Sequence, residues 1–195
     1  MSFYTATITL ILVMDPLGNI PLFLSILKNI HPKRQAWIIL RESFIAFIIL
    51  TLFLFFGGNI LHGLNITEPA LNIAGGIVLF IISLRMIFPH PDTTAQDSIH
   101  GEPFIVPLAV PLTAGPATLA TVLLFATQQP EQMGAWFGAL IIASVLFTLV
   151  LLCSRFLMKI LGQRGLIAVE RLMGMILTTV SVQMFLSGIS EYFKF

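Results

Sequence analysis

The sequence predicts an all-α integral membrane protein, in which six transmembrane helices form two inverted three-helix repeats and helices 1 and 4 are broken. Three observations lead to this fold class. Hydrophobic residues make up 57% of the 195 residues, charged residues make up 10%, and the mean hydropathy is +0.98. The apolar residues gather into runs of roughly 20, which is the length that a helix needs to cross the hydrocarbon core. The first and fourth runs contain similar proline-bearing interruptions.

Each of the six runs is predominantly apolar and is bounded by polar, turn-rich residues. The runs cover residues 3–27, 35–61, 68–88, 104–126, 135–157 and 166–189. The segments between them read KNIHPKR, HGLNITEP, PHPDTTAQDSIHGEP, TQQPEQMG and LGQR. The expected organisation is one membrane domain over residues 1–195, with one repeat at about 1–90, a polar connection at about 89–103 and a second repeat at about 104–195.

The basic residues divide unequally between the two sides of the membrane. Of the ten Lys and Arg residues, only Lys194 lies on the side of the termini. The other nine lie at the first, third and fifth segments between runs, and they are Lys28, Lys33, Arg34, Arg41, Arg85, Arg155, Lys159, Arg164 and Arg171. Because Lys and Arg are enriched in cytoplasmic segments, we expect these three segments in the cytoplasm and both termini on the opposite side.

Similar motifs lie in the middle of runs 1 and 4. PLGNIP at 16–21 and PLTAGP at 111–116 share the pattern P-L-x-x-x-P. The third run of each half also matches, since NIAGGIVLFI and RLMGMILTTV align Gly75 with Gly174. Three crossings per half is an odd number, so the second half enters the membrane from the opposite side. The pattern predicts an inverted repeat, which is typical of secondary transporters. Two unrelated proline kinks are the alternative.

The breaks themselves indicate a binding site. A proline inside a helix leaves backbone groups without partners, and hydrocarbon cannot satisfy them. We expect Pro21 and Pro116 each to begin a half-helix, because proline suits the first helical turn. The free N–H groups and positive dipole ends of these half-helices would then meet near the midplane, where they suit the carboxylate of a small solute.

Asp15 is the only acidic residue deep inside a run. An ionisable group at that depth indicates a functional site, so Asp15 is a candidate to bind a coupling H⁺ or Na⁺. The alternative is structural: Asp15 is an N-cap of the broken half-helix, and Pro16 is the first helical residue. The two roles are compatible, because a capping carboxylate still titrates.

The other candidate substrate contacts are small or polar residues at the breaks and in runs 3 and 6. With Asp15, the predicted binding set contains Gly18, Asn19, Pro21, Thr113, Gly115, Pro116, Asn72 and Gln183. The alternative for the residues at the breaks is that they satisfy the broken backbone. For those in runs 3 and 6, hydrogen bonding between helices is the favoured reading, and Gly75, Gly76 and Gly174 are expected to allow close helix packing.

Two charged pairs near the cytoplasmic ends of runs 2 and 6 are candidates for a gate. They are Arg41–Glu42 and Glu170–Arg171, for which a structural ion pair or snorkelling is the favoured explanation. The four histidines and the single cysteine have no metal-ligand spacing, and no nucleotide-binding motif is present, so we expect no metal, cofactor or direct use of ATP. The expected partners are a small-molecule substrate and the lipid bilayer, and no nucleic acid is expected. The residues leave the oligomeric state undecided.

The motifs resemble the MarC family, and especially its YhgN-type members. The matching pieces are DPLGNIPLF, NIAGGIVLF, VPLTAGPAT and RLMGMIL…VQMFLSGI, in the expected order over the whole chain. The resemblance implies six spans in a bacterial inner membrane, with both termini then periplasmic, and kinship with LysE-type exporters. It also implies that residues 15–21 and 113–116 are signature positions. Some relatives are described as transporters of small neutral amino acids such as glycine and alanine.

The predicted function is secondary transport or export of small neutral solutes, such as these amino acids, by alternating access around a midplane site formed by the two breaks. A passive channel and a non-transporting membrane subunit are the alternatives. An enzyme is not expected, because Asp15 alone cannot form an aspartyl dyad, and the chain has no H-E-x-x-H motif and no histidine or lysine in mid-membrane to activate a serine. The substrate, the coupling ion and the direction of transport are left open by the residues.

Overall fold

The computed structural model describes residues 2–27, 30–88 and 108–193, and all regular secondary structure in this part of the chain is helical. The elements are α1 (Phe3–Met14), α2 (Ile20–Ile26), α3 (Pro32–Leu64), α4 (Glu68–Ile87), the π-helical η1 (Leu108–Thr113), α5 (Pro116–Gln128), the 3₁₀ turn η2 (Pro130–Gln132), α6 (Met133–Leu152) and α7 (Ser154–Tyr192). The predicted connection at about 89–103, the start of run 4, Lys28 and Lys194 lie outside the described residues.

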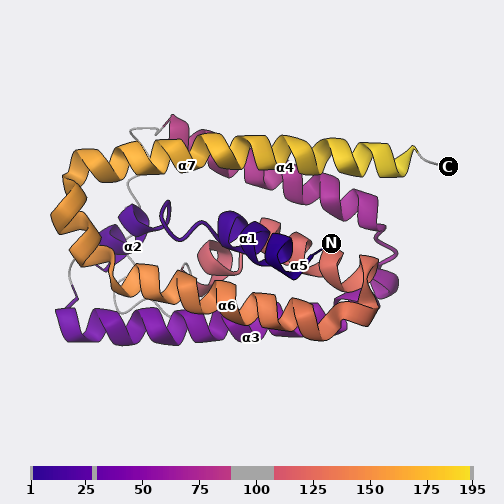
Figure 1. Cartoon of the computed structure of the whole chain (residues 1–195), viewed down its shortest axis with the longest axis horizontal. Coiled ribbons are helices and arrows are strands. Elements are labelled where there is room, and N and C mark those ends of the chain that lie inside the picture. The colour runs from indigo at the N-terminus through magenta and orange to yellow at the C-terminus, as the bar shows by residue number, and fades with distance from the viewer. Residues whose placement is uncertain (1, 28–29, 89–107, 194–195) are drawn as a thin grey trace.

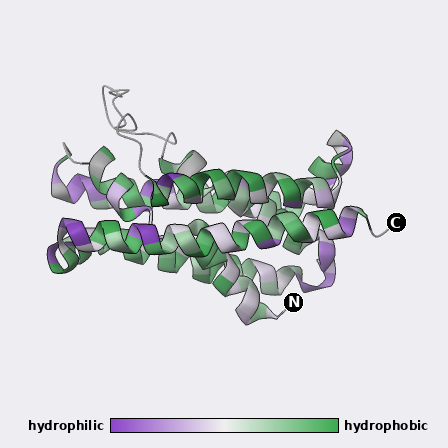
Figure 2. Cartoon of the chain, turned by 90° about the horizontal axis from the view of Figure 1, so that it is seen from above, coloured by the Kyte–Doolittle hydropathy of each residue, from purple (hydrophilic) through white to green (hydrophobic). Residues whose placement is uncertain are grey.

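Four helical stretches in the described residues are long and apolar enough to cross a membrane. They are Lys33–Gly63, Pro69–Ile87, Pro130–Leu152 and Ser154–Tyr192, and they correspond to the predicted runs 2, 3, 5 and 6. Runs 1 and 4 contain shorter apolar helices instead. Hydrophobic residues dominate the middle of the bundle and hydrophilic residues gather towards both ends (Figure 2). This distribution fits the predicted class of all-α integral membrane protein.

The short helices lie inside the bundle. In Figure 1, α4 and α7 run along one side, α3 and α6 run along the other, and α1 and α5 lie between these pairs. The contacts agree with the view, because α4 packs on α7, α1 on α6 and α3 on α5. The start of α1 and the end of α7 lie towards the same end of the molecule (Figure 1).

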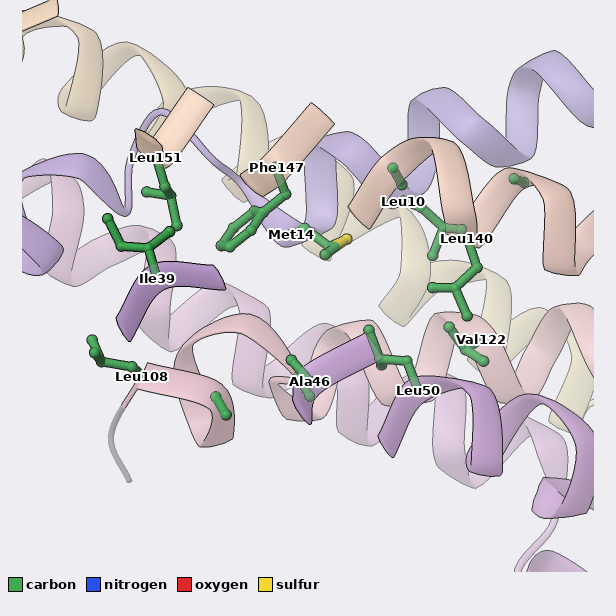
Figure 3. Close-up of a cluster of buried hydrophobic side chains, with 14 of the residues drawn as sticks. Leu10, Met14, Ile39, Ala46, Leu50, Leu108, Val122, Leu140, Phe147 and Leu151 are labelled. Atoms are coloured by element: carbon green, nitrogen blue, oxygen red, sulfur yellow. The ribbon is translucent and has the colours of Figure 1, made fainter. Parts of the chain in front are cut away.

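The main apolar cluster joins α1, α3, α5 and α6. Figure 3 shows Leu10, Met14, Leu50, Val122 and Phe147 from these four helices directed into one buried region. Lipid is as apolar as these side chains, so the cluster stabilises the bundle by close packing rather than by removal of apolar surface from water. The cluster therefore holds the interrupted helices between their longer neighbours.

The contact between α4 and α7 depends on small residues. A Cβ atom on Gly76 would lie 2.9 Å from the carbonyl oxygen of Ser181, and one on Gly188 would lie 2.9 Å from the carbonyl oxygen of Pro69. Such distances to backbone atoms leave no room for a side chain. The two helices thus approach closely along most of their length.

The predicted packing role of the three glycines is confirmed. A Cβ atom on Gly174 would lie 3.0 Å from Cβ of Met86, on the same α4–α7 contact. A Cβ atom on Gly75 would lie 2.7 Å from Cβ of Ala120, which belongs to α5. Helix α4 therefore uses neighbouring glycines to contact two different helices.

The boundary between runs 5 and 6 differs from the prediction. Helix α6 ends at Leu152 rather than at residue 157, and the predicted LGQR segment lies within α7. The chain turns inside α7 at Gly162, whose φ of 66° and ψ of 175° are not helical. Glycine adopts this positive φ without steric cost, so the turn needs only this one residue rather than a polar loop.

We predict that Gly188→Ala lowers the thermal stability of the protein in detergent. Alanine favours a helix by about 1 kcal/mol over glycine, but overpacking costs about 1–3 kcal/mol. The new methyl group would meet the Pro69 carbonyl of α4. Gly134→Ala is the matched control, since a Cβ atom there would meet nothing within 4 Å. Equal melting temperatures for the two variants would contradict the close α4–α7 packing.

Candidate functional site

The first break lies between α1 and α2. Asp15 follows the last residue of α1 and adopts the left-handed region, with φ 46° and ψ 67°. Its backbone N–H donates to the carbonyl of Ile11, and its Oδ1 accepts a hydrogen bond from the backbone N–H of Gly18, with donor and acceptor 3.0 Å apart in each case. Helix α2 then begins at Ile20. Asp15 therefore closes the C-terminal end of α1.

This geometry corrects one predicted alternative. The interpretation of Asp15 as an N-cap, with Pro16 as the first helical residue, is wrong. Aspartate tolerates the left-handed region and binds nearby backbone N–H groups, so it suits the turn that ends a helix. As a result, Asp15 lies at the negative end of the α1 dipole, and its carboxylate binds the Gly18 N–H in the turn before α2.

Asn19 satisfies backbone groups that the break exposes. Its Nδ2 donates to the carbonyl oxygens of Met14 and Asp15, each at 3.0 Å. The last carbonyls of a helix have no partner within the helix. Asn19 thus satisfies the broken backbone, which is the structural alternative considered for it. Its contact with substrate stays a prediction.

Gly18 is a point of close approach within the first break. A Cβ atom there would overlap both the Asp15 carboxylate and the side-chain methyl group of Met86 on α4. The absence of a side chain therefore lets the turn fold back on Asp15 and lets the break lie against α4. The sequence does not predict this close approach of Gly18 to Met86.

The second break lies between η1 and α5. Val110 leaves the helical region, with φ −131° and ψ 128°. Thr113 Oγ1 donates to the carbonyl of Leu108 at 2.9 Å and so satisfies broken backbone, as Asn19 does in the first break. Gly115 is the N-cap and Pro116 is the first residue of α5, as predicted. In the first break, Pro21 lies one residue after the start of α2.

The two breaks begin at corresponding positions. Asp15 precedes Pro16 and Val110 precedes Pro111, and these prolines align in the two P-L-x-x-x-P motifs. Both preceding residues have non-helical backbone angles. Contact with a proline ring drives the preceding residue from the α region towards extended angles, and Val110 adopts such angles. Asp15 instead adopts the left-handed region, so the two breaks share a position but differ in backbone conformation.

The breaks come together on one stretch of the α4–α7 pair. A buried apolar cluster contains one residue from each of α1, α4, α5 and α7, namely Val13, Leu79, Ala117 and Leu177. Val13 lies two residues before Asp15, and Ala117 directly follows Pro116. Asp15 is 5% exposed and Thr113 is 2% exposed, so both breaks are enclosed by protein, as hydrocarbon requires.

The polar residues predicted from runs 3 and 6 lie in different surroundings. Asn72 is buried on α4, three and four residues before Gly75 and Gly76, and so on the same helix face. Gln183 is exposed on α7, where its Nε2 donates to Ser187 Oγ at 3.2 Å. The structure does not bring Gln183 to the breaks, because the inner face of α7 is formed by other positions.

Of the two candidate gate pairs, Arg41–Glu42 forms an ion pair, and no ion pair between Glu170 and Arg171 is seen among the described residues. Arg41 Nε donates to Glu42 Oε1 at 2.8 Å within α3, and Glu42 is fully buried. This is the structural ion pair that the sequence favours. On α7, Arg171 is exposed, whereas Glu170 is half-buried and lies within electrostatic reach of Asp15. This electrostatic interaction of Glu170 with the first break is not indicated by its position near a helix end in the sequence.

Two further side chains, which the sequence does not single out, close the hairpins that follow the breaks through hydrogen bonds. Gln35 Nε2 donates to the carbonyl oxygens of Leu27 at 2.6 Å and Ile30 at 2.8 Å, and so ties the end of α2 to α3. Trp136 Nε1 donates to the carbonyl of Gln129 at 3.0 Å, and so ties the end of α5 to α6. Each donor is buried and is the fourth residue of its helix.

A cavity of about 540 Å³ opens between the ends of α3 and α5. Its lining includes Gly58, His62, Asn65, Thr67 and Thr127. None of the break residues lines it. Next to it, a Cβ atom on Gly57 would overlap the Leu123 side chain of α5, so α3 and α5 are in close contact there. Among the described residues, no group of three or more His, Cys, Asp or Glu side chains is arranged to hold a metal ion.

Comparison with known proteins agrees with the resemblance seen in the motifs. The profile described as MarC family integral membrane protein matches residues 1–193. The UPF0056 inner membrane protein YhgN of Escherichia coli K12 is 46% identical over 191 residues, with 97% of each chain covered. A UPF0056 membrane protein of Chlamydia trachomatis is 32% identical over 196 residues, covering 99% of this chain and 95% of the relative. No solved structure gives a significant match.

The matches and the apolar helices support a multi-pass inner-membrane location. The chain belongs to the MarC family of integral membrane proteins.

Proposed function

We propose that the chain is a secondary transporter or exporter of small neutral solutes, with amino acids such as glycine or alanine as the substrate class. One observation carries the proposal: two interrupted helices are buried and meet on the same stretch of the α4–α7 pair. Interrupted helices inside a membrane bundle are typical of transporter binding sites. A purely structural subunit has no need of two costly breaks at one place.

The pairing of the helices supports the inverted repeat. In that repeat α1 corresponds to η1, α2 to α5, α3 to α6, and α4 to α7. The contact of α1 with α6 then corresponds to the contact of η1 with α3, the contact of α2 with α7 corresponds to that of α5 with α4, and all four contacts are present. Because α4 and α7 correspond to each other, the repeat relates the α4–α7 contact to itself. The matched hydrogen bonds of Gln35 and Trp136 follow the same correspondence.

The electrostatics of the breaks favour a zwitterion. The first break combines the C-terminal end of α1 with the Asp15 carboxylate, and both are negative. The second break presents the N-terminal end of α5, which is positive and begins at Pro116. A small amino acid carries an ammonium group for the first and a carboxylate for the second. Asp15 is also the candidate site for a coupling H⁺ or Na⁺.

The proposed movement takes place against the α4–α7 pair. The glycine contacts make that pair a firm support. The hydrogen bonds of Gln35 and Trp136 keep α2 with α3 and α5 with α6, so each hairpin moves as a unit. The cavity lined by His62 and Thr127 is the vestibule on one side, closed from the breaks where Leu123 packs on Gly57.

We predict saturable uptake of radiolabelled glycine or alanine by liposomes that contain the purified protein. A pH or Na⁺ gradient should drive accumulation above the external concentration, because alternating access couples solute to ion. Protein-free liposomes are the control. Flux that never saturates and never accumulates would instead indicate a channel, and no movement of any small neutral solute would indicate a non-transporting subunit.

We predict that Asp15→Asn abolishes gradient-driven accumulation, to the level of protein-free liposomes. Asparagine retains an oxygen for the Gly18 N–H and tolerates the left-handed region, so the fold should persist. Loss of the charge alone should therefore uncouple transport. Glu131→Gln is the matched control, since Glu131 is exposed in η2. If Asp15→Asn changed neither accumulation nor the melting temperature, Asp15 would not bind the coupling ion. Its role would then be limited to closing the end of α1.

We predict that both termini are periplasmic. In a Cys153→Ser background, an impermeant maleimide added to intact spheroplasts should label Thr67→Cys but not Gln163→Cys. Both residues are exposed, and they lie in opposite end segments of the bundle. The measurement is labelling before and after membrane permeabilisation. Labelling of Gln163→Cys alone in intact spheroplasts would show the reverse orientation.

A further inference from the structure

The outer face of α3 changes from basic to apolar along its length. At its start Lys33 and Arg34 are exposed, and Trp37 is 54% exposed. Leu40, Phe44 and Ile48 continue the same exposed stripe. Steps of three and four residues place these side chains on one helix face. Because Lys33–Gly63 is apolar enough to span a membrane, the basic end of the stripe lies at the level of the lipid headgroups and the apolar part at the level of the acyl chains.

The basic end of the stripe borders a cavity. The cavity has a volume of about 390 Å³ and is lined by His31, Lys33, Arg34 and Trp37. The guanidinium carbons of Arg34 and Arg41 lie 5.9 Å and 4.9 Å from the centre of the Trp37 ring. The ring therefore gathers two guanidinium groups beside the cavity by cation–π attraction.

Charge complementarity decides what this cavity would bind. Among the described residues, its lining contains a lysine and an arginine and no acidic side chain, and Glu42 pairs with Arg41 nearby. Arginine and lysine both bind phosphate, and arginine donates to it in a fixed planar fork. A soluble phosphate compound would use the cations but not the exposed apolar stripe below them. A phospholipid uses both.

We propose that an anionic diacyl phospholipid binds this face of α3. Its phosphate lies in the cavity formed by His31, Lys33, Arg34 and Trp37, and one acyl chain follows Leu40, Phe44 and Ile48. The neighbouring Gln35 is the residue that ties the end of α2 to α3. The lipid thus contacts the hairpin that carries the first break. This inference does not depend on the transport function.

Trp37 provides a direct probe of the lipid. The chain has two tryptophans, and the other, Trp136, is only 1% exposed. The full chain is reconstituted in liposomes with either phosphatidylglycerol or phosphatidylcholine brominated near the top of the acyl chains. We expect the brominated phosphatidylglycerol to quench tryptophan emission more strongly than the same fraction of brominated phosphatidylcholine. Trp37→Phe should remove this difference.

Two double variants test the role of the cations. K33Q/R34Q should abolish the preference for phosphatidylglycerol. R155Q/K159Q is the matched control, because it removes two exposed cations from α7 and should leave the preference unchanged. Equal quenching of the native chain by both lipids would overturn the proposal, and this comparison needs no variant to fold. A preference lost equally in both double variants would also overturn it, since it would show general attraction to basic residues.

Discussion

Backbone N–H and C=O groups cannot remain unpaired in hydrocarbon, and the arrangement of this bundle follows from that constraint. Prolines 16 and 111 break two helices and expose such groups. Asn19 and Thr113 satisfy some of them from within the breaks. The other exposed backbone groups are kept away from lipid, because α1 and α5 lie between the α4–α7 and α3–α6 pairs (Figure 1). The long helices α3, α4 and α6, and α7 beyond its turn at Gly162, can face lipid because their backbone groups are paired internally.

Enclosing the breaks also sets the electrostatics of the candidate site. Two helix ends of opposite polarity lie on the same stretch of α4 and α7, and the negative one carries the Asp15 carboxyl group. With little water near them, helix dipoles and charges act more strongly than they do at a surface. The proposed substrate class, a small solute with separated charges, rests on these two helix ends.

Much of this architecture was accessible from the sequence. Long apolar runs predict membrane helices because the bilayer permits few alternatives, and P-L-x-x-x-P located both breaks because proline acts on its immediate neighbours. Properties that depend on tertiary contacts were not accessible. Asp15 caps α1 because the chain folds back through Gly18 against Met86. The outward direction of Gln183, the approach of Glu170 to Asp15 and the hydrogen bond of Trp136 likewise depend on how helices face one another.

Both breaks begin directly before an aligned proline, but the residues at that position differ in conformation and in chemistry. Asp15 aligns with Val110, so corresponding positions carry an acid in one half and an apolar side chain in the other. In the proposed alternating-access cycle the two halves would exchange their conformations, and the proposed inverted repeat would make the two end states similar in energy. The single carboxylate stays with the first half throughout. Its surroundings then differ between the two states, and a coupling ion binds with different affinity in each, which is the condition for a gradient to bias the cycle.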